Sequence, residues 1–121
     1  MNTVFVVQYP MRREEATGAM RPVHDITPAA RFGNLEFLLP AGPVLLSTDA
    51  AVTTLRSKLR GFKPGDYMLC LGDPVAIAAA AAVVAQFNGG VIPMLVWDKR
   101  LRDYLPITVD TNARRDHHAA A

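Results

Sequence analysis

The sequence predicts a single α/β domain with a mixed, mostly parallel sheet of about five strands and two main helices, in the order β-β-α-β-α-β-β. Short β-branched and aromatic runs alternate with two longer segments that carry helix start and stop signals. Strand-helix-strand units have right-handed crossovers, which make the strands on either side of a helix parallel. A chain of 121 residues is long enough to bury roughly two-thirds of its unfolded surface in one domain.

The centre of the prediction is the stretch of residues 66–97. Residues 67–71 read as a strand, and Asp73 with the following proline starts a helix over residues 74–87 that ends at Asn88-Gly89-Gly90. Residues 91–97 form the next strand. No charged residue lies within this helix, so we expect it to be covered on more than one side, by the rest of the domain or by a second copy of the chain in a homodimer.

The amino-terminal part predicts two strands separated by a long connection. Residues 3–9 are β-branched and aromatic and form the first strand, inside the sheet. Residues 11–33 are polar and interrupted by glycines and prolines, which predicts a long loop or a hairpin with its tip near Gly18. Connections of this length are often functional. Residues 27–33 carry the start and stop signals of one helical turn, and residues 35–39 form the second strand.

The first main helix follows a short extended piece at residues 44–46, is capped by Ser47 or Thr48, and stops at Gly61. Its apolar residues recur at helical spacing and predict one buried stripe, made of Val52, Leu55, Leu59 and Phe62. Its other positions carry cations and predict a basic outward surface, made of Arg56, Lys58, Arg60 and Lys63.

The last strands form a hairpin at or near a sheet edge, because Pro93 and Pro106 each lack a ladder donor. We expect the second, third and fourth strands to form the parallel core, with the first and fifth strands completing a mixed sheet. The domain then spans residues 1–110. In residues 111–121 the apolar residues do not recur at the spacing of a helix or a strand, which predicts a disordered tail.

The composition indicates a cytoplasmic protein. The single Cys70 can form no intramolecular disulfide and lies in an apolar run, which is typical of a core residue in a reducing compartment. The amino terminus lacks the features of a signal peptide, and no apolar run reaches the roughly 20 residues that a bilayer requires. A net charge of +2 is too small to indicate nucleic acid as the partner.

The turn at Gly72 and Asp73 lies where open parallel sheets bind ligands, after a strand and at a helix start, and is a candidate ligand turn. Three features favour a plain helix cap instead. One glycine is present where phosphate loops have several, no Lys, Ser or Thr follows, and Asp73 places negative charge where an anion would bind. A nucleotide-binding protein or small enzyme is therefore the third hypothesis for function.

No set of residues predicts catalysis, a metal site or a cofactor. His24 beside Asp25 is the internal histidine, and in a proline-rich loop it is more typical of a surface residue than of a general base. Cys70 has no neighbouring base, and the histidines and cysteine lack the spacing of metal ligands. We therefore predict no catalytic residue, no metal and no cofactor.

Three segments carry a resemblance to a known group of proteins: residues 4–40 (VFVVQYPMRREEATGAMRPVHDITPAARFGNLEFLLP), 66–83 (DYMLCLGDPVAIAAAAAV) and 95–110 (LVWDKRLRDYLPITVD). They resemble small uncharacterised proteins of tailed phages and prophages. The resemblance implies a phage setting and the cytoplasm of the host cell, and it transfers no functional residue.

The leading hypothesis is a non-enzymatic binding or regulatory protein that acts on a host or phage protein through its long loop and basic helix. The residues expected to form this binding surface are Arg12, Arg13, Arg56, Arg60 and Lys63. The alternative is a nucleic-acid-binding accessory protein of phage replication or transcription that uses the same surface. No membrane contact is expected.

Overall fold

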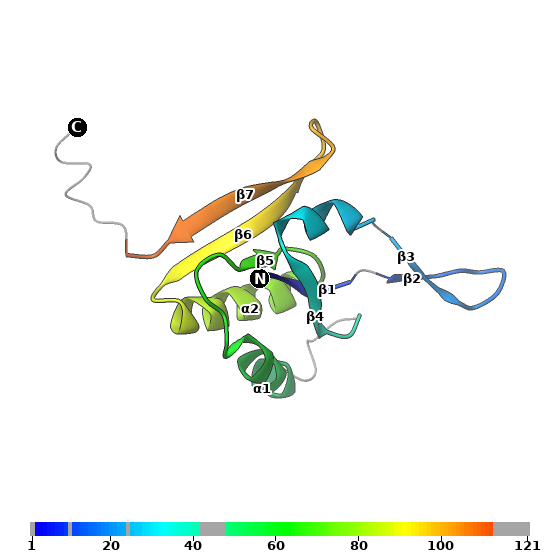
Figure 1. Ribbon diagram of the computed structural model, residues 1–121. Helices are drawn as coiled ribbons and strands as arrows, with labels where there is room; N and C mark the ends of the chain where they lie inside the picture. Colours follow the sequence, from blue (N-terminus) through cyan, green and yellow to red (C-terminus); the bar gives the residue numbers. More distant parts are fainter. Residues whose placement is uncertain (1, 10, 24, 42–47, 113–121) are drawn as a thin grey trace.

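The computed structural model describes residues 2–9, 11–23, 25–41 and 48–112. They form a five-stranded sheet with two α-helices on one face and a short 3-10 helix on the other, and a two-stranded hairpin projects from this body (Figure 1). This arrangement confirms the predicted α/β class.

The strands of the main sheet are β1 (Thr3–Gln8), β4 (Asn34–Leu39), β5 (Tyr67–Leu69), β6 (Val91–Asp98) and β7 (Asp103–Asp110). The hairpin consists of β2 (Met11–Arg13) and β3 (Met20–Pro22). The helices are η1 (Thr27–Phe32), α1 (Thr48–Leu59) and α2 (Pro74–Phe87). The predicted extended piece at residues 44–46, the cap candidate Ser47, His24 and residues 113–121 lie outside the described residues.

Strand β1 lies between β4 and β5 and is parallel to both, in the order β4-β1-β5-β6-β7. Strands β5 and β6 are also parallel, and β7 is antiparallel to β6. The parallel core therefore has four strands, and the first strand is part of it. The sequence predicted a parallel core of the second, third and fourth strands, which are β4, β5 and β6. The crossover through α1 passes β1 on its way from β4 to β5, so β1 joins this core.

The central position of β1 follows from its side chains. Phe5 and Val7 belong to the core between the sheet and the α-helices, whereas Val4 and Val6 belong to the core beneath η1. Because successive side chains of a strand point to opposite faces, a continuous apolar run fits a strand that is covered on both faces.

Helix α2 is covered by the sheet and by α1, which accounts for much of its apolar surface. Its buried residues are small or β-branched: Ala76, Ala80, Val83 and Val84. In α1, Leu55 and Leu59 are fully buried as predicted, but Ala51 is buried where Val52 was expected. Alanines at the contact let the two helix axes lie close together.

Helix η1 is held against β7 by Arg31. Its guanidinium donates to Asp103 Oδ1 at 2.5 Å and to the Tyr104 carbonyl at 3.3 Å. The hydrogen bond from Arg31 holds the pKa of the Asp103 carboxyl below its usual range. Both side chains are half-exposed, so we expect this ion pair to contribute little to stability and chiefly to fix the position of η1.

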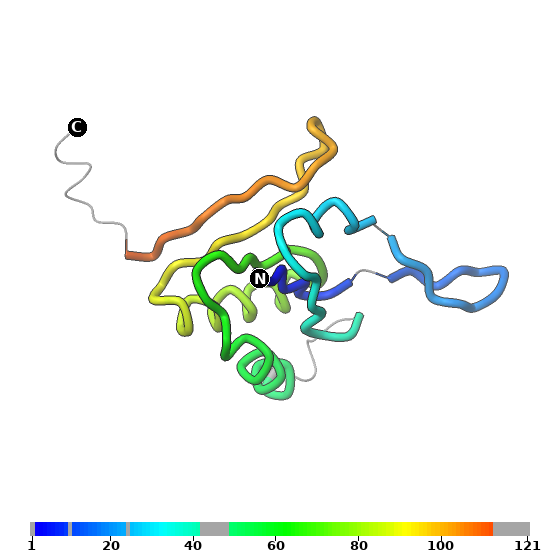
Figure 2. Tube along the Cα trace, viewed as in Figure 1, coloured from blue at the N-terminus to red at the C-terminus, as the bar shows by residue number. Residues whose placement is uncertain are grey.

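Residues 11–22, which we call the arm, form the projecting hairpin (Figures 1 and 2). Its strands pair from Met11 opposite Pro22 to Arg13 opposite Met20. Gly18 closes the turn with a φ of +70°, a left-handed conformation that favours glycine, and its N–H donates to the Glu14 carbonyl at 2.8 Å.

The carboxylate of Asp66 joins the start of β1 to the turn before β5. It is 1% exposed, and its oxygens accept hydrogen bonds from the Thr3 N–H at 2.9 Å, the Lys63 N–H at 3.1 Å and the Lys63 ammonium at 2.8 Å. Burying a carboxylate is costly unless donors compensate it, and these three donors do so. Asp66 thereby holds the start of β1 against the turn before β5.

Replacing Asp66 by alanine should lower the free energy of unfolding by about 1–3 kcal/mol, because two partly buried N–H groups and the half-exposed Lys63 ammonium lose their acceptor. Urea denaturation followed by circular dichroism measures the change. Glu15→Ala, at an exposed site on the arm, is the control and should stay within about 0.5 kcal/mol of the parent chain. Equal stability of the two variants would contradict the role given to Asp66.

Candidate functional site

The residues predicted to form one binding surface lie at opposite ends of the sheet. Lys63 contacts Asp66, which also binds the N–H of Thr3 at the amino end of β1. Arg12 and Arg13 lie on the arm, which follows the carboxyl end of β1. The structure therefore does not bring the arm and the basic helix end together.

Most cations of the basic helix contact other parts of the chain. The Arg56 guanidinium donates to Gln86 Oε1 at 2.5 Å and lies 5.4 Å from the centre of the Phe87 ring. The ammonium of Lys58 donates to the Phe37 carbonyl at 3.1 Å. Arg60 is exposed. These contacts tie α1 to its neighbours and reduce the number of cations available to a partner.

The turn at Gly72 and Asp73 lies beside Gln8, at the point where open parallel sheets have a crevice. The chain leaves β1 toward β4 on one side, and it leaves β5 toward β6 on the other. Gln8 is 2% exposed; its Oε1 accepts from the Asp73 N–H at 2.7 Å and its Nε2 donates to the Pro40 carbonyl at 2.8 Å. The Gln8 side chain therefore occupies the space between the two strand ends.

Both residues of this turn have structural roles. Asp73 caps α2, since its Oδ1 accepts from the Val75 N–H at 2.9 Å. Gly72 has a φ of +116°, and a β-carbon there would lie 2.6 Å from the side chain of Gln8. The geometry thus explains both residues through the packing of the β5–α2 turn against β1.

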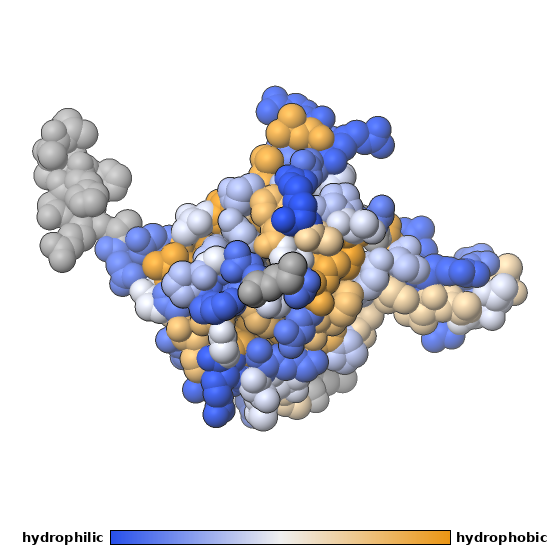
Figure 3. Space-filling view, in the orientation of Figure 1, coloured by the Kyte–Doolittle hydropathy of each residue, from blue (hydrophilic) through white to orange (hydrophobic). Residues whose placement is uncertain are grey.

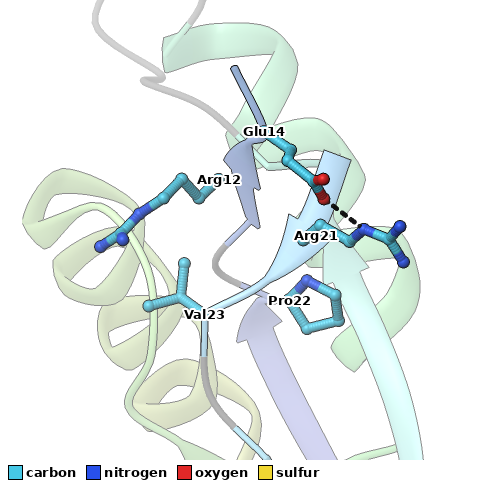
Figure 4. Close-up of a pocket in the computed structure, with 5 residues that line it drawn as sticks. All are labelled: Arg12, Glu14, Arg21, Pro22 and Val23. Atoms are coloured by element: carbon cyan, nitrogen blue, oxygen red, sulfur yellow. Dashed lines mark hydrogen bonds and ion pairs between the residues drawn. The ribbon is translucent and has the colours of Figure 1, made fainter. Parts of the chain in front are cut away.

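A hollow of about 280 Å³ lies at the base of the arm (Figure 4). Its lining residues come from both arm strands and the segment after them: Arg12, Glu14, Arg21, Pro22 and Val23. Arg21 Nε donates to Glu14 Oε2 at 2.8 Å, and Arg12 lies on the other side of the hollow from this ion pair. Arg12 therefore remains a cation at the edge of the hollow.

A second hollow, of about 220 Å³, is lined by Val23, Asp25, Trp97 and Tyr104. We call it the aromatic hollow. It adjoins the first, because Val23 lines both. The rings of Trp97 and Tyr104 meet edge to face, with their centres 5.0 Å apart. Trp97 is 38% exposed, whereas Tyr104 is 1% exposed.

The ionisable groups of the aromatic hollow are perturbed by their neighbours. Hydrogen bonds from Thr27, including its N–H at 2.9 Å, hold the pKa of the Asp25 carboxyl below its usual range. Burial raises the pKa of the Tyr104 hydroxyl, and the charges of Asp25 and Tyr9 act in the same direction. At neutral pH the hollow thus contains a carboxylate and a neutral phenol.

Sequence reasoning missed this hollow. Trp97 was only the last residue of the predicted strand over residues 91–97, Tyr104 was not singled out, and Asp25 was considered only with His24. The available signal was the hairpin itself: Trp97 lies near the end of β6 and Tyr104 near the start of β7, so antiparallel pairing places them opposite each other. The packing of η1 that brings Asp25 there is a long-range contact and has no local signal.

Large apolar side chains are exposed around the two hollows. Met20 is 47% exposed on the arm, Val23 is 41% exposed between the hollows, and Leu101 is 60% exposed in the β6–β7 turn. In the space-filling view, apolar atoms stand among hydrophilic ones at the tip of the β6–β7 hairpin and along the arm (Figure 3). Exposed apolar groups mixed with cations are typical of protein-binding surfaces.

Within the described ranges, no group of three or more His, Cys, Asp or Glu side chains is placed to hold a metal ion. None of the described helices is long and apolar enough to cross a membrane. Cys70 is partly buried, and burial raises the pKa of its thiol to about 11. Its sulfur contacts the Met68 carbonyl at 3.9 Å. A thiol of this kind is protonated at neutral pH.

These features define a small α/β protein with a four-stranded parallel core, an antiparallel edge strand and a projecting arm. The family model of the phage Pam3 gp32-like protein matches residues 2–111, so the chain belongs to this family of phage proteins. The resemblance to phage proteins is thereby confirmed. Comparison with curated proteins and with solved structures gives no match.

Cys70 should react with Ellman's reagent roughly 100-fold more slowly in the folded chain than in denaturant, because a pKa of about 11 in place of 9.0 lowers the thiolate fraction by this factor. Since the chain has one cysteine, the whole signal belongs to it. Equal rates in the two states would contradict the assignment.

The same shift predicts a pH dependence of stability. The folded pKa of Cys70 lies above its ordinary value of 9.0, so the folded state holds the proton more tightly. The contribution of the Cys70 thiol to the free energy of unfolding is therefore complete below pH 9 and is lost as the pH rises toward 11. Comparison of denaturation curves across this range for the parent chain and for Cys70→Ala isolates it, because the variant should lack this component.

Proposed function

We propose that this phage protein is a non-enzymatic binding protein that engages a host or phage protein partner at the carboxyl end of its sheet, through the arm and the hollows at its base. The observation that supports the proposal is the arm itself. It forms a separate two-stranded sheet, and no strand of the main sheet pairs with it in the described part of the chain.

An isolated two-stranded hairpin is marginally stable in water, because it buries little apolar surface for the conformational entropy that it loses. No residue of the arm belongs to either core cluster, and its ion pair between Glu14 and Arg21 is exposed. A partner that packs against the arm, or adds a strand to it, would supply the missing contacts. This is the behaviour expected of a recognition element.

A protein partner is favoured over nucleic acid by the surroundings of the arm. Nucleic-acid phosphates require a continuous set of available cations, whereas Arg56, Lys58 and Lys63 are held in contacts within the chain. Next to the arm cations stand Met20 and Val23, whose exposed apolar surfaces suit a protein interface. Of the binding surface predicted from the sequence, the proposal keeps Arg12 and Arg13 and adds their neighbours Met20 and Val23.

Reversing the charge of Arg12 and Arg13 together, as R12E/R13E, should abolish capture of the partner from host or infected-cell lysate, measured by quantitative mass spectrometry. Arg60→Glu is the matched control: it also reverses an exposed cation, but it lies at the other end of the molecule, and capture should persist. Loss of capture in the control with retention in the arm variant would contradict the proposal. Salt-sensitive binding of short oligonucleotides would instead support the nucleic-acid alternative.

We propose in addition that the chain forms a homodimer through α2. The side of this helix that faces away from the core carries Val75, Ala78, Ala82 and Gln86 at exposed positions, without a charge. Sedimentation equilibrium at tens of micromolar should show a dimer. Ala82→Glu should shift it toward monomer, because a carboxylate in an apolar interface is costly, while Thr17→Glu on the arm should not. Monomer alone for the parent chain would overturn this idea.

A further inference from the structure

We propose that the aromatic hollow binds a single cationic side chain, arginine or lysine, that the protein partner inserts beside the arm. That a protein partner provides this side chain rests on the function proposed above. The capacity of the hollow to hold a guanidinium or ammonium group is a property of this chain alone and can be tested without the partner.

Two parts of the chain build the hollow: the segment that joins β3 to η1 and the β6–β7 hairpin. Val23 follows β3, Asp25 precedes η1, Trp97 lies near the end of β6 and Tyr104 near the start of β7. The contact of Arg31 with Asp103 and Tyr104 fixes η1 against this hairpin, so the distance between Asp25 and the two rings is held by the fold. A site assembled in this way is formed before a ligand arrives, which lowers the entropy cost of binding.

The charge in the hollow is negative. Asp25 is exposed, and among the described residues no lysine or arginine forms an ion pair with it. The nearby acids have other contacts: Asp103 pairs with Arg31, and Asp98 accepts a hydrogen bond from the N–H of Leu101 at 2.9 Å. Asp25 is therefore the carboxylate that a ligand in the hollow would contact, and a cationic ligand would form an ion pair with it.

The aromatic walls select for the same group. Trp97 and Tyr104 both line the hollow, but Trp97 is 38% exposed and Tyr104 only 1%, so the tryptophan ring supplies nearly all of the aromatic surface that a ligand could reach. Ring faces attract arginine and lysine, and tryptophan does so best. Tyr104 is almost fully buried and packs against Trp97, so it holds the tryptophan ring in place at the edge of the hollow.

Other occupants fit less well. A neutral apolar side chain would cover Asp25 without neutralising it, and an anion would be repelled by it. A volume of about 220 Å³ is smaller than the roughly 300 Å³ at which pockets for drug-sized ligands begin, which favours one side chain over a nucleotide. The size of the hollow, the charge of Asp25 and the exposed tryptophan ring together point to one long cationic side chain.

The test uses Trp97 as its own reporter, because it is the one tryptophan of the chain and borders the hollow. Fluorescence of the full-length protein is titrated with N-acetyl-arginine amide, N-acetyl-lysine amide and, as an uncharged control of similar length, N-acetyl-norleucine amide. The two cationic probes should give a saturable change with millimolar affinity, as expected for a single side chain. The norleucine probe should give none.

Asp25→Asn should weaken binding of the cationic probes roughly tenfold, because it removes the charge and keeps an oxygen that can accept from the Thr27 N–H. Tyr104→Phe should weaken it less and keeps the core filled. Glu15→Gln, which removes an exposed charge from the arm tip, should bind as the parent chain does. Thermal unfolding by circular dichroism identifies any variant that has lost its fold.

The inference is overturned if the cationic probes give no saturable change, if norleucine binds equally well, or if Asp25→Asn leaves their affinity unchanged. Its failure is separable from that of the proposed function. R12E/R13E should lose partner capture but still bind the arginine probe, because neither residue lines the aromatic hollow. Asp25→Asn should weaken both partner capture and probe binding. Probe binding without partner capture would leave this inference standing and remove the protein-binding function.

Discussion

The burial of β1 on both faces is the constraint on which the rest of the structure depends. The strand is parallel to both neighbours and contributes to both cores. A buried polar group fixes each end: Asp66 binds the N–H of Thr3 at the start, and Gln8 binds the Asp73 N–H and the Pro40 carbonyl at the finish. The two cores can form only if these groups hold β1 in register, because a slip of one residue would exchange its two faces.

The same strand decides where a partner can bind. In open parallel sheets the crevice at the carboxyl end of the central strands is the usual ligand site. Here Gln8 fills that space and Gly72 packs against it. The chain leaving β1 must turn outward, and it forms the arm. One remaining hollow is formed by the arm and Val23, and the other lies between Val23, Asp25 and the β6–β7 hairpin.

Local signals in the sequence were sufficient for the elements and insufficient for their arrangement. Asp73 with its proline predicted the start of α2, and the glycines after it predicted its end, since caps depend on neighbouring residues. The place of β1 between β4 and β5 depends on a crossover and could not be predicted locally. The contact of Arg56 with Gln86 spans 30 residues, so a helix that appeared to present a basic surface uses that cation to hold its neighbour.

The aromatic hollow shows why the binding surface was harder to predict than the fold. Its carboxylate and its rings are more than 70 residues apart, and Arg31 brings them together through Asp103, a contact between residues 72 apart in sequence. The resulting surface places the arm cations beside a carboxylate, with the apolar Val23 between the two hollows. Opposite charges at fixed positions around an apolar centre favour one orientation of a partner and repel the reverse. A projecting arm alone would provide contact area, but this order of charges would also provide specificity.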